Sequence, residues 1–306
     1  MRIVMAGASG FLGQNLRRRL TDEGYELTQL VRRPPVSADQ RQWYPDRGEL
    51  DPELLAGADA VINLTGAGVE DKRWNEAYRK VLVDSRVKPT ATLAKTLAGL
   101  PADRRPAMLL NSSAVGYYGD TGDTPVDEAS PPGTDFFADM CQAWEGATGA
   151  ARDAGVRVVN LRSGLVLDRS GGLLKPMILP YYLGLGGPMA GGRSWMPWIS
   201  LYDWHSAVIF LMGRDDIAGP VNLVGPEPVR NAEFARALGR ALHRPAIIPL
   251  PKIALRIMLG AFADEGAVLS ERVLPGVLNR TGFTFAHPDL DSALRATFDR
   301  QPQPQR

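Results

Sequence analysis

The 306-residue chain has a single cysteine, Cys141, and only three histidines. One thiol cannot form an internal disulfide, so the sequence predicts a protein of the reducing cytoplasm. No group of His, Cys and Asp residues has the spacing of metal ligands, and we therefore expect no metal. His205 precedes an apolar run with helical spacing, which favours a helix residue over a catalytic base.

The chain also lacks an excess of charge and a long apolar run. Its 35 Lys and Arg residues nearly balance 34 Asp and Glu residues, so charge gives no reason to expect a nucleic acid or membrane partner. The most apolar stretch, residues 173–189, contains Lys175 and three prolines and cannot be a membrane-spanning helix. The first residues are typical of a strand and not of a signal peptide. We expect a soluble protein.

Strand-like and helix-like segments alternate through the first half of the chain. Short apolar runs predict buried strands at 2–6, 26–31, 59–64, 107–113 and 156–161. Helical spacing predicts helices at 10–22, 85–98 and 136–153. This alternation is typical of an α/β fold with a doubly wound parallel sheet, the Rossmann architecture.

The composition changes near residue 168. We expect a nucleotide-binding domain at 1–168, a smaller α/β substrate lobe at 169–300 that can return elements to the first domain, and a disordered tail at 301–306. The Gly- and Pro-rich segment 170–200 is interpreted as an ordered loop that covers the substrate. Asn231 is interpreted as the N-cap of a helix.

The segment AGASGFLG follows the first strand and begins a helix. Glycines at this position let the backbone approach a pyrophosphate, which the helix N-terminus then binds. The alternative is a tight turn without a ligand. The expected cofactor contacts here are Gly7, Ala8, Ser9, Gly10, Phe11, Leu12 and Gly13.

The second strand ends at Arg32 and Arg33, nineteen residues after Gly13. An NAD site usually has Asp or Glu there, whereas a guanidinium pairs with a 2′-phosphate. The sequence therefore favours NADP(H). The alternative is that Arg32 and Arg33 are two solvent-exposed arginines before a proline turn, without a ligand. The strand predicted at 59–64 ends at Leu64 and is followed by Thr65, Gly66 and Ala67. Small residues there allow the chain to pass over the nucleotide, but they also suit any turn at the end of a strand.

Several segments together resemble the extended short-chain dehydrogenases/reductases, and most closely their atypical, epimerase-like family. These segments are GASGFLG, DAVINLTGAG, SSAVGYYG, KRWNEAYRK, DFFADMCQAWE, LRSGLVLDRSGG, LPYYLGLGGPM and MPWISLYDW, with GFTFAHPDLDSAL near the end. The resemblance covers Arg2 to about Phe298. It implies an NADP-type Rossmann domain with a small C-terminal lobe, and homodimers are common in the superfamily. It also implies cofactor contacts at Ser112, Cys141, Arg162 and Gly164.

The resemblance fails at the catalytic helix. The superfamily uses a Ser or Thr, a Tyr, and a Lys four residues after the Tyr on the same helix face. Ser113 fits the first role, or it caps a turn, but the Tyr and Lys positions hold Phe137 and Cys141. Tyr117, Tyr118, Cys141 or Asp139 remains as a proton donor, although the last two also suit helix residues without a chemical role. A phenol keeps its proton at pH 7 without help from a lysine.

Aromatic and cationic residues suggest a pocket for an apolar substrate with an acidic group, although the tryptophans suit a core equally well. These residues are Trp74, Arg193, Trp195 and Trp198. The sequence thus favours an NADP(H)-dependent oxidoreductase or epimerase-like enzyme with a non-standard proton donor. The alternative is an NADP(H)-binding redox sensor or scaffold without turnover, which the missing Tyr/Lys pair favours.

Overall fold

The computed structural model describes residues 1–259 and 268–299. None of the helices in these ranges has both the length and the apolar character needed to cross a bilayer. The strands are β1 Arg2–Ala6, β2 Glu26–Val31, β3 Gln40–Gln42, β4 Ala60–Asn63, β5 Met108–Ala114, β6 Arg157–Ser163, β7 Leu165–Leu167, β8 Trp195–Met196, β9 Trp198–Ser200, β10 Gly219–Leu223 and β11 Val229–Arg230. The helices are α1 Phe11–Asp22, α2 Glu76–Gly99, α3 Phe136–Gly146, α4 Gly149–Asp153, α5 Leu174–Tyr182, α6 Leu201–Met212, α7 Asn231–Leu242, α8 Lys252–Leu259, α9 Gly276–Arg280 and α10 Leu290–Phe298, with short 3-10 helices η1 Pro45–Arg47, η2 Pro52–Leu54 and η3 Val115–Tyr118.

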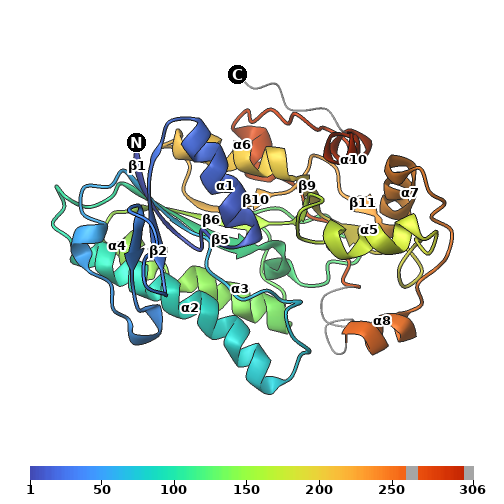
Figure 1. Ribbon diagram of the computed structural model, residues 1–306, viewed down its shortest axis with the longest axis horizontal. Helices are drawn as coiled ribbons and strands as arrows, with labels where there is room; N and C mark the ends of the chain where they lie inside the picture. Colours follow the sequence, from blue (N-terminus) through green and yellow to red (C-terminus); the bar gives the residue numbers. More distant parts are fainter. Residues whose placement is uncertain (260–267, 300–306) are drawn as a thin grey trace.

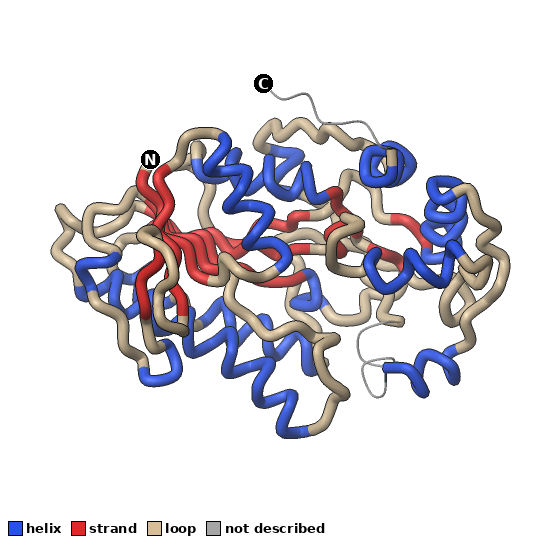
Figure 2. The backbone as a smooth tube through the Cα atoms, viewed as in Figure 1, coloured by secondary structure: helices blue, strands red, loops and turns tan. Residues whose placement is uncertain are grey.

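Seven parallel strands form the central sheet, in the order β10-β6-β5-β4-β1-β2-β3. Helices α2, α3 and α4 cover one face, and α1 and α6 cover the other (Figures 1 and 2). Because both faces are covered, β1 and β4 are apolar and buried almost throughout. The predicted doubly wound α/β fold is confirmed.

Two predicted helices have different bounds. Helix α2 begins at Glu76, nine residues before the predicted start, because the Asn75 side chain accepts a hydrogen bond from the Tyr78 amide and caps it. The single helix predicted at 136–153 is divided into α3 and α4.

The prediction for Asn231 is also corrected. Arg230 is the N-cap of α7, and Asn231 is its first helical residue. The Asn231 side chain accepts from the Met189 amide and so fixes the preceding segment, rather than capping its own helix. The segment 170–200, predicted as a loop, contains α5, β8 and β9.

The C-terminal part of the chain contributes to two cores. Strand β10 joins the central sheet beside β6, and α6 packs into the core beneath α1 through Trp204. Around α5, α7 and α10 a separate core forms, which includes Trp198 and Phe234. The boundary at residue 168 stays a prediction, and the tail at 301–306 lies outside the described residues.

His205 lies on α6 with its ring buried, and its Nε2 has no hydrogen-bond partner among the described residues. Burial, followed by the charges of Arg19 and Arg18, lowers the pKa of His205 from 6.5 to about 4. Between these pH values the unfolded chain binds a proton that the folded chain does not bind.

We therefore expect the free energy of unfolding to fall by about 1.4 kcal/mol per unit as the pH is lowered from 6.5 towards 4. Urea unfolding of His205→Leu across this range should show a flatter dependence than the wild type. The exposed His243, replaced in His243→Asn, is the control and should keep the wild-type slope. An unchanged slope in His205→Leu would contradict the assignment.

Candidate nucleotide and catalytic site

The turn between β1 and α1 contains three glycines. At two of them, the surrounding atoms leave no room for a side chain. Gly7 has a φ of 81°, and a Cβ there would overlap the Leu64 carbonyl group at the end of β4. A Cβ on Gly13 would overlap the Gly7 carbonyl oxygen. A Cβ on Gly10 would come no closer than 3.7 Å to another described atom of this turn. The first and third glycines therefore allow close backbone packing, and the exposed second one leaves the surface of the turn open.

The start of α1 is suited to an anion. The first helical bond is donated by Gln14, so the amides of Phe11, Leu12 and Gly13 have no acceptor within the helix. The first turn contains no acidic residue. Ser9 beside it is exposed, whereas Ala8 is buried. Free amides and the helix dipole together form a site for a phosphate group.

Arg32 and Arg33 lie exposed directly after β2, which pairs with β1. No hydrogen bond or ion pair joins either guanidinium group to another residue of the described ranges. These two guanidinium groups, without a partner in the described ranges, therefore lie one strand away from the glycine turn.

The loop after β4 is fixed from below by helix α2. Thr65 donates its hydroxyl proton to Asn63, and the Ala67 amide donates to Ser85. Arg86 donates to the Ala67 carbonyl, and a Cβ on Gly66 would lie 3.3 Å from the Arg86 Cζ. The backbone at residue 66 thus rests directly on a guanidinium group.

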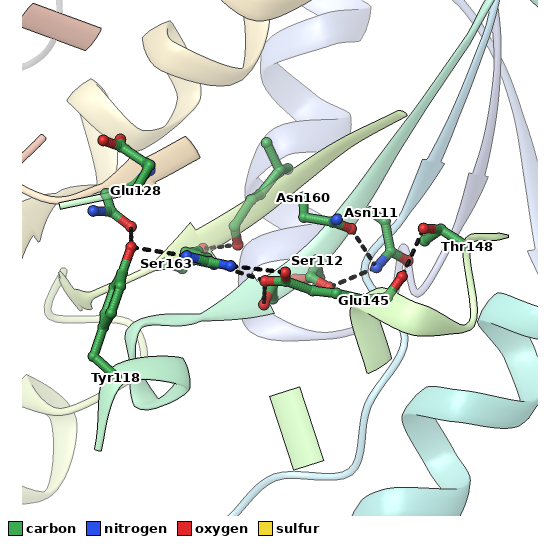
Figure 3. A network of polar contacts seen from close by, with 12 residues as sticks. Asn111, Ser112, Tyr118, Glu128, Glu145, Thr148, Asn160 and Ser163 are labelled. Carbon is green, nitrogen blue, oxygen red and sulfur yellow. Dashed lines mark hydrogen bonds and ion pairs between the residues drawn. The ribbon is translucent and has the colours of Figure 1, made fainter. Parts of the chain in front are cut away.

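A buried polar network lies at the carboxyl end of β5 and β6 (Figure 3). Arg162 donates two hydrogen bonds of 2.8 and 2.9 Å to the Glu145 carboxylate, and Ser113 donates a third of 2.7 Å. Arg162 also donates to the Tyr118 hydroxyl, which donates in turn to Asn222. Burial opposes the charge of Arg162, but Glu145 holds the pKa of Arg162 above its usual value.

This network engages the hydroxyl groups of both Ser113 and Tyr118. The Ser113 proton is donated to Glu145, which leaves this hydroxyl only as an acceptor for any further partner, and its predicted role in polarising a carbonyl stays a prediction. The Tyr118 proton is donated to Asn222, and burial raises the pKa of Tyr118 to about 12 despite the opposing charge of Arg162. Ser112 lies on the other face of β5, because successive residues of a strand alternate.

Three residues that the resemblance implies as cofactor contacts are buried or tightly packed in this structure, and as cofactor contacts they stay predictions. Cys141 is 0% exposed, and burial, with a smaller effect of Glu145, raises its pKa to about 12, so it is an inert thiol. Arg162 is held by Glu145. A Cβ on Gly164 would overlap the Pro197 carbonyl, so this glycine serves chain packing.

The position where the superfamily has its tyrosine belongs to an aromatic cluster. Phe137 packs against Trp74, with Tyr78 and Met140 in the same buried group. The Trp198 indole is buried in the second core and donates to the Glu227 carbonyl. This burial favours a packing role for Trp74 and Trp198, and a contact of either with a substrate stays a prediction.

Trp195 and Arg193 are placed differently. Trp195 is half-buried, lies between the guanidinium groups of Arg230 and Arg272, and donates to Asp123. Arg193 is exposed two residues earlier. Both stay predictions as substrate contacts.

Tyr117 differs from its neighbour. Its ring lies flat against Arg162, with 3.4 Å from the Cζ to the ring centroid, and edge-on to Tyr118. The side chain is half-buried, and its hydroxyl makes no hydrogen bond to another residue that the structure describes. Of the two tyrosines, this is the one whose hydroxyl proton is not donated to a described residue.

Residues 3–224 match the model of the NAD dependent epimerase/dehydratase family. The chain belongs to this family. Residues 250–297 also match DUF1731, a domain of unknown function. The resemblance found in the sequence is thereby confirmed.

Similar proteins cover nearly the whole chain. An epimerase family protein of Mycobacterium bovis is 43% identical over 95% of this chain and 96% of its own. The crystal structure of human epimerase family protein SDR39U1 with NADPH has a TM-score of 0.88 and 33% identity, covering 98% of this chain and all of the human one. A nucleoside-diphosphate sugar epimerase from Corynebacterium glutamicum has a TM-score of 0.80 and 31% identity, covering 97% of this chain and 58% of its own.

Two charged residues of this family member were missed in the sequence. Glu145 lies four residues after Cys141 and eight after Phe137, so helical spacing places it on the same face. Arg86 lay next to the predicted helix start, where its burial was not evident. The helical spacing of α3 was thus the signal available for Glu145, whereas none pointed to Arg86.

The glycine turn yields a test of the site's construction. We expect Gly13→Ala to lower the free energy of unfolding by about 1–3 kcal/mol, because its methyl group meets backbone atoms that cannot move aside. Gly10→Ala is the matched control and should change it by less than about 0.5 kcal/mol. Equal losses in the two variants, measured by urea unfolding, would contradict this view of the turn.

Proposed function

We propose that this chain is an NADP(H)-dependent oxidoreductase or epimerase-like enzyme that acts on a small molecule and uses Tyr117 as its proton donor. The observation that carries the proposal is the glycine turn at α1 with two free arginines at the next strand. The human relative crystallised with NADPH supports it.

The chain's own groups fit this cofactor. The free amides at the start of α1 suit the pyrophosphate, and the absent side chains at Gly7 and Gly13 allow the loop after β4 to approach it. Arg32 and Arg33 suit a 2′-phosphate, for which they carry unused donors. The Phe11 ring packs against Gly171, so the segment after β7 covers the start of α1.

When bound, NADPH supplies a hydride to a carbonyl carbon. Tyr117 gives its phenol proton to the carbonyl oxygen, and the phenolate formed then lies against the Arg162 guanidinium. Solvent returns the proton to the half-buried phenol. Ser113, whose own proton is donated to Glu145, accepts a hydrogen bond from a ligand hydroxyl or amide.

The cofactor preference is tested by titrating NADPH, NADP⁺, NADH and NAD⁺ against the wild type and Arg32→Ala. We expect the phosphorylated pair to bind more tightly to the wild type, and this preference to fall about tenfold or more in the variant, because a charge-assisted bond is lost. Arg41→Ala, which removes an exposed arginine of β3, is the control. Equal affinity for all four dinucleotides would contradict the assignment.

The proton donor is tested with a panel of carbonyl compounds and quinones, by following NADPH absorbance. For any compound that is reduced, Tyr117→Phe should lower the rate about 100-fold or more, since general-acid catalysis is worth that much, and leave NADPH affinity unchanged. Tyr44→Phe, at an exposed phenol, is the control. An unchanged rate would exclude Tyr117, and no reduction across the panel would favour a binding protein without turnover.

A further inference from the structure

Arg86 is a buried cation with no carboxylate partner among the residues that the structure describes. It is 8% exposed, and it donates to the carbonyl oxygens of Leu82 and Ala67 at 2.9 and 3.0 Å. Its Nε has no hydrogen-bond partner, and it forms no ion pair with any residue of the described ranges. Its guanidinium lies 5.1 Å from the centre of the Trp144 ring.

The groups around Arg86 leave its charge uncompensated. The side chains whose charge acts on it are the Cys141 thiol and the Tyr78 phenol. Both are neutral at pH 7, because burial raises the pKa of each above its ordinary value. Arg162, the other buried arginine at this edge of the sheet, is by contrast neutralised by Glu145. A buried unpaired charge is costly, and such charges concentrate at functional sites.

Arg86 lies on the side of the sheet where the nicotinamide end of the cofactor is expected. In the sheet, β4 and β5 lie on the side of β1 opposite to β2. With the 2′-phosphate at the end of β2 and the pyrophosphate at α1, the nicotinamide end extends towards β4 and β5. Arg86 lies under the loop that follows β4, and beside α3, which packs against β5.

We propose that Arg86 makes the site discriminate between the redox states of its cofactor, by disfavouring the cationic nicotinamide ring of NADP⁺ relative to the neutral ring of NADPH. This inference rests on the NADP(H) binding proposed above. The two cofactor forms differ by one positive charge on that ring, and a second buried cation repels only the oxidised form. In its resting state, the protein then binds mainly the reduced cofactor.

The effect is large enough to measure. Two unit charges about 10 Å apart in an effective dielectric of about 20 change a dissociation constant by on the order of tenfold. Water screens this repulsion less than it screens a charge on the surface, because Arg86 is buried.

The experiment is a titration of NADPH and of NADP⁺ against the wild type, Arg86→Met, Arg86→Gln and Arg86→Lys. We expect the wild type to bind NADPH about tenfold more tightly or better, the two neutral variants to bind both forms with similar affinity, and Arg86→Lys to keep the preference. Lys95→Met removes an exposed charge from the same helix and should change nothing. 2′-Phospho-ADP-ribose, which lacks the nicotinamide, should bind equally to the wild type and Arg86→Gln.

The outcomes separate this inference from the proposed function. Wild-type protein that binds both forms equally well overturns the role of Arg86 and leaves NADP(H) binding intact. A preference that survives in Arg86→Gln, with an unchanged thermal unfolding midpoint, also overturns it. Wild-type protein that binds neither form overturns both proposals.

Discussion

The ion pair between Glu145 and Arg162 organises the carboxyl ends of β5 and β6, where the candidate site lies. It joins α3 to β6, holds the Ser113 hydroxyl of β5, and through Tyr118 reaches Asn222 on β10. The Arg162 side chain is buried and that of Glu145 is only 13% exposed, so each charge depends largely on the other; removing one partner of a buried pair typically costs about 3–5 kcal/mol. The positions of η3, α3 and three strands of the sheet are therefore fixed together.

Helix α3, which carries Glu145, departs from the superfamily pattern along one face. Phe137, Cys141 and Glu145 follow one another on one face of α3. The first packs on Trp74, the second is enclosed, and the third carries the charge. The helix has become a structural element, and the free phenol lies on η3, with the Tyr117 ring stacked on Arg162.

The charges at the edge of the sheet differ in their surroundings. Arg32 and Arg33 lie in solvent, where salt weakens their effect and where they can bind a phosphate that arrives from solution. Arg162 is buried and paired with Glu145, whereas Arg86 is buried and has no carboxylate partner among the described residues. The proposals made above give the exposed pair a role in selecting the nucleotide and Arg86 a role at its nicotinamide end.

Local sequence patterns were sufficient to predict the glycine turn, the succession of strands and helices, the family, and the absence of the Tyr/Lys pair. Each of these follows from residue types at short, fixed spacings, which are local properties of a chain. Which of the chemically capable side chains are free of a protein partner could be seen only in the folded chain. Tyr118 is bonded to Asn222, 104 positions away, and Ser113 to Glu145, 32 positions away, whereas the hydroxyl of Tyr117 is bonded to no described residue. Spacing gives the face on which a side chain lies, but the partner that takes its proton comes from a distant segment that only folding brings near.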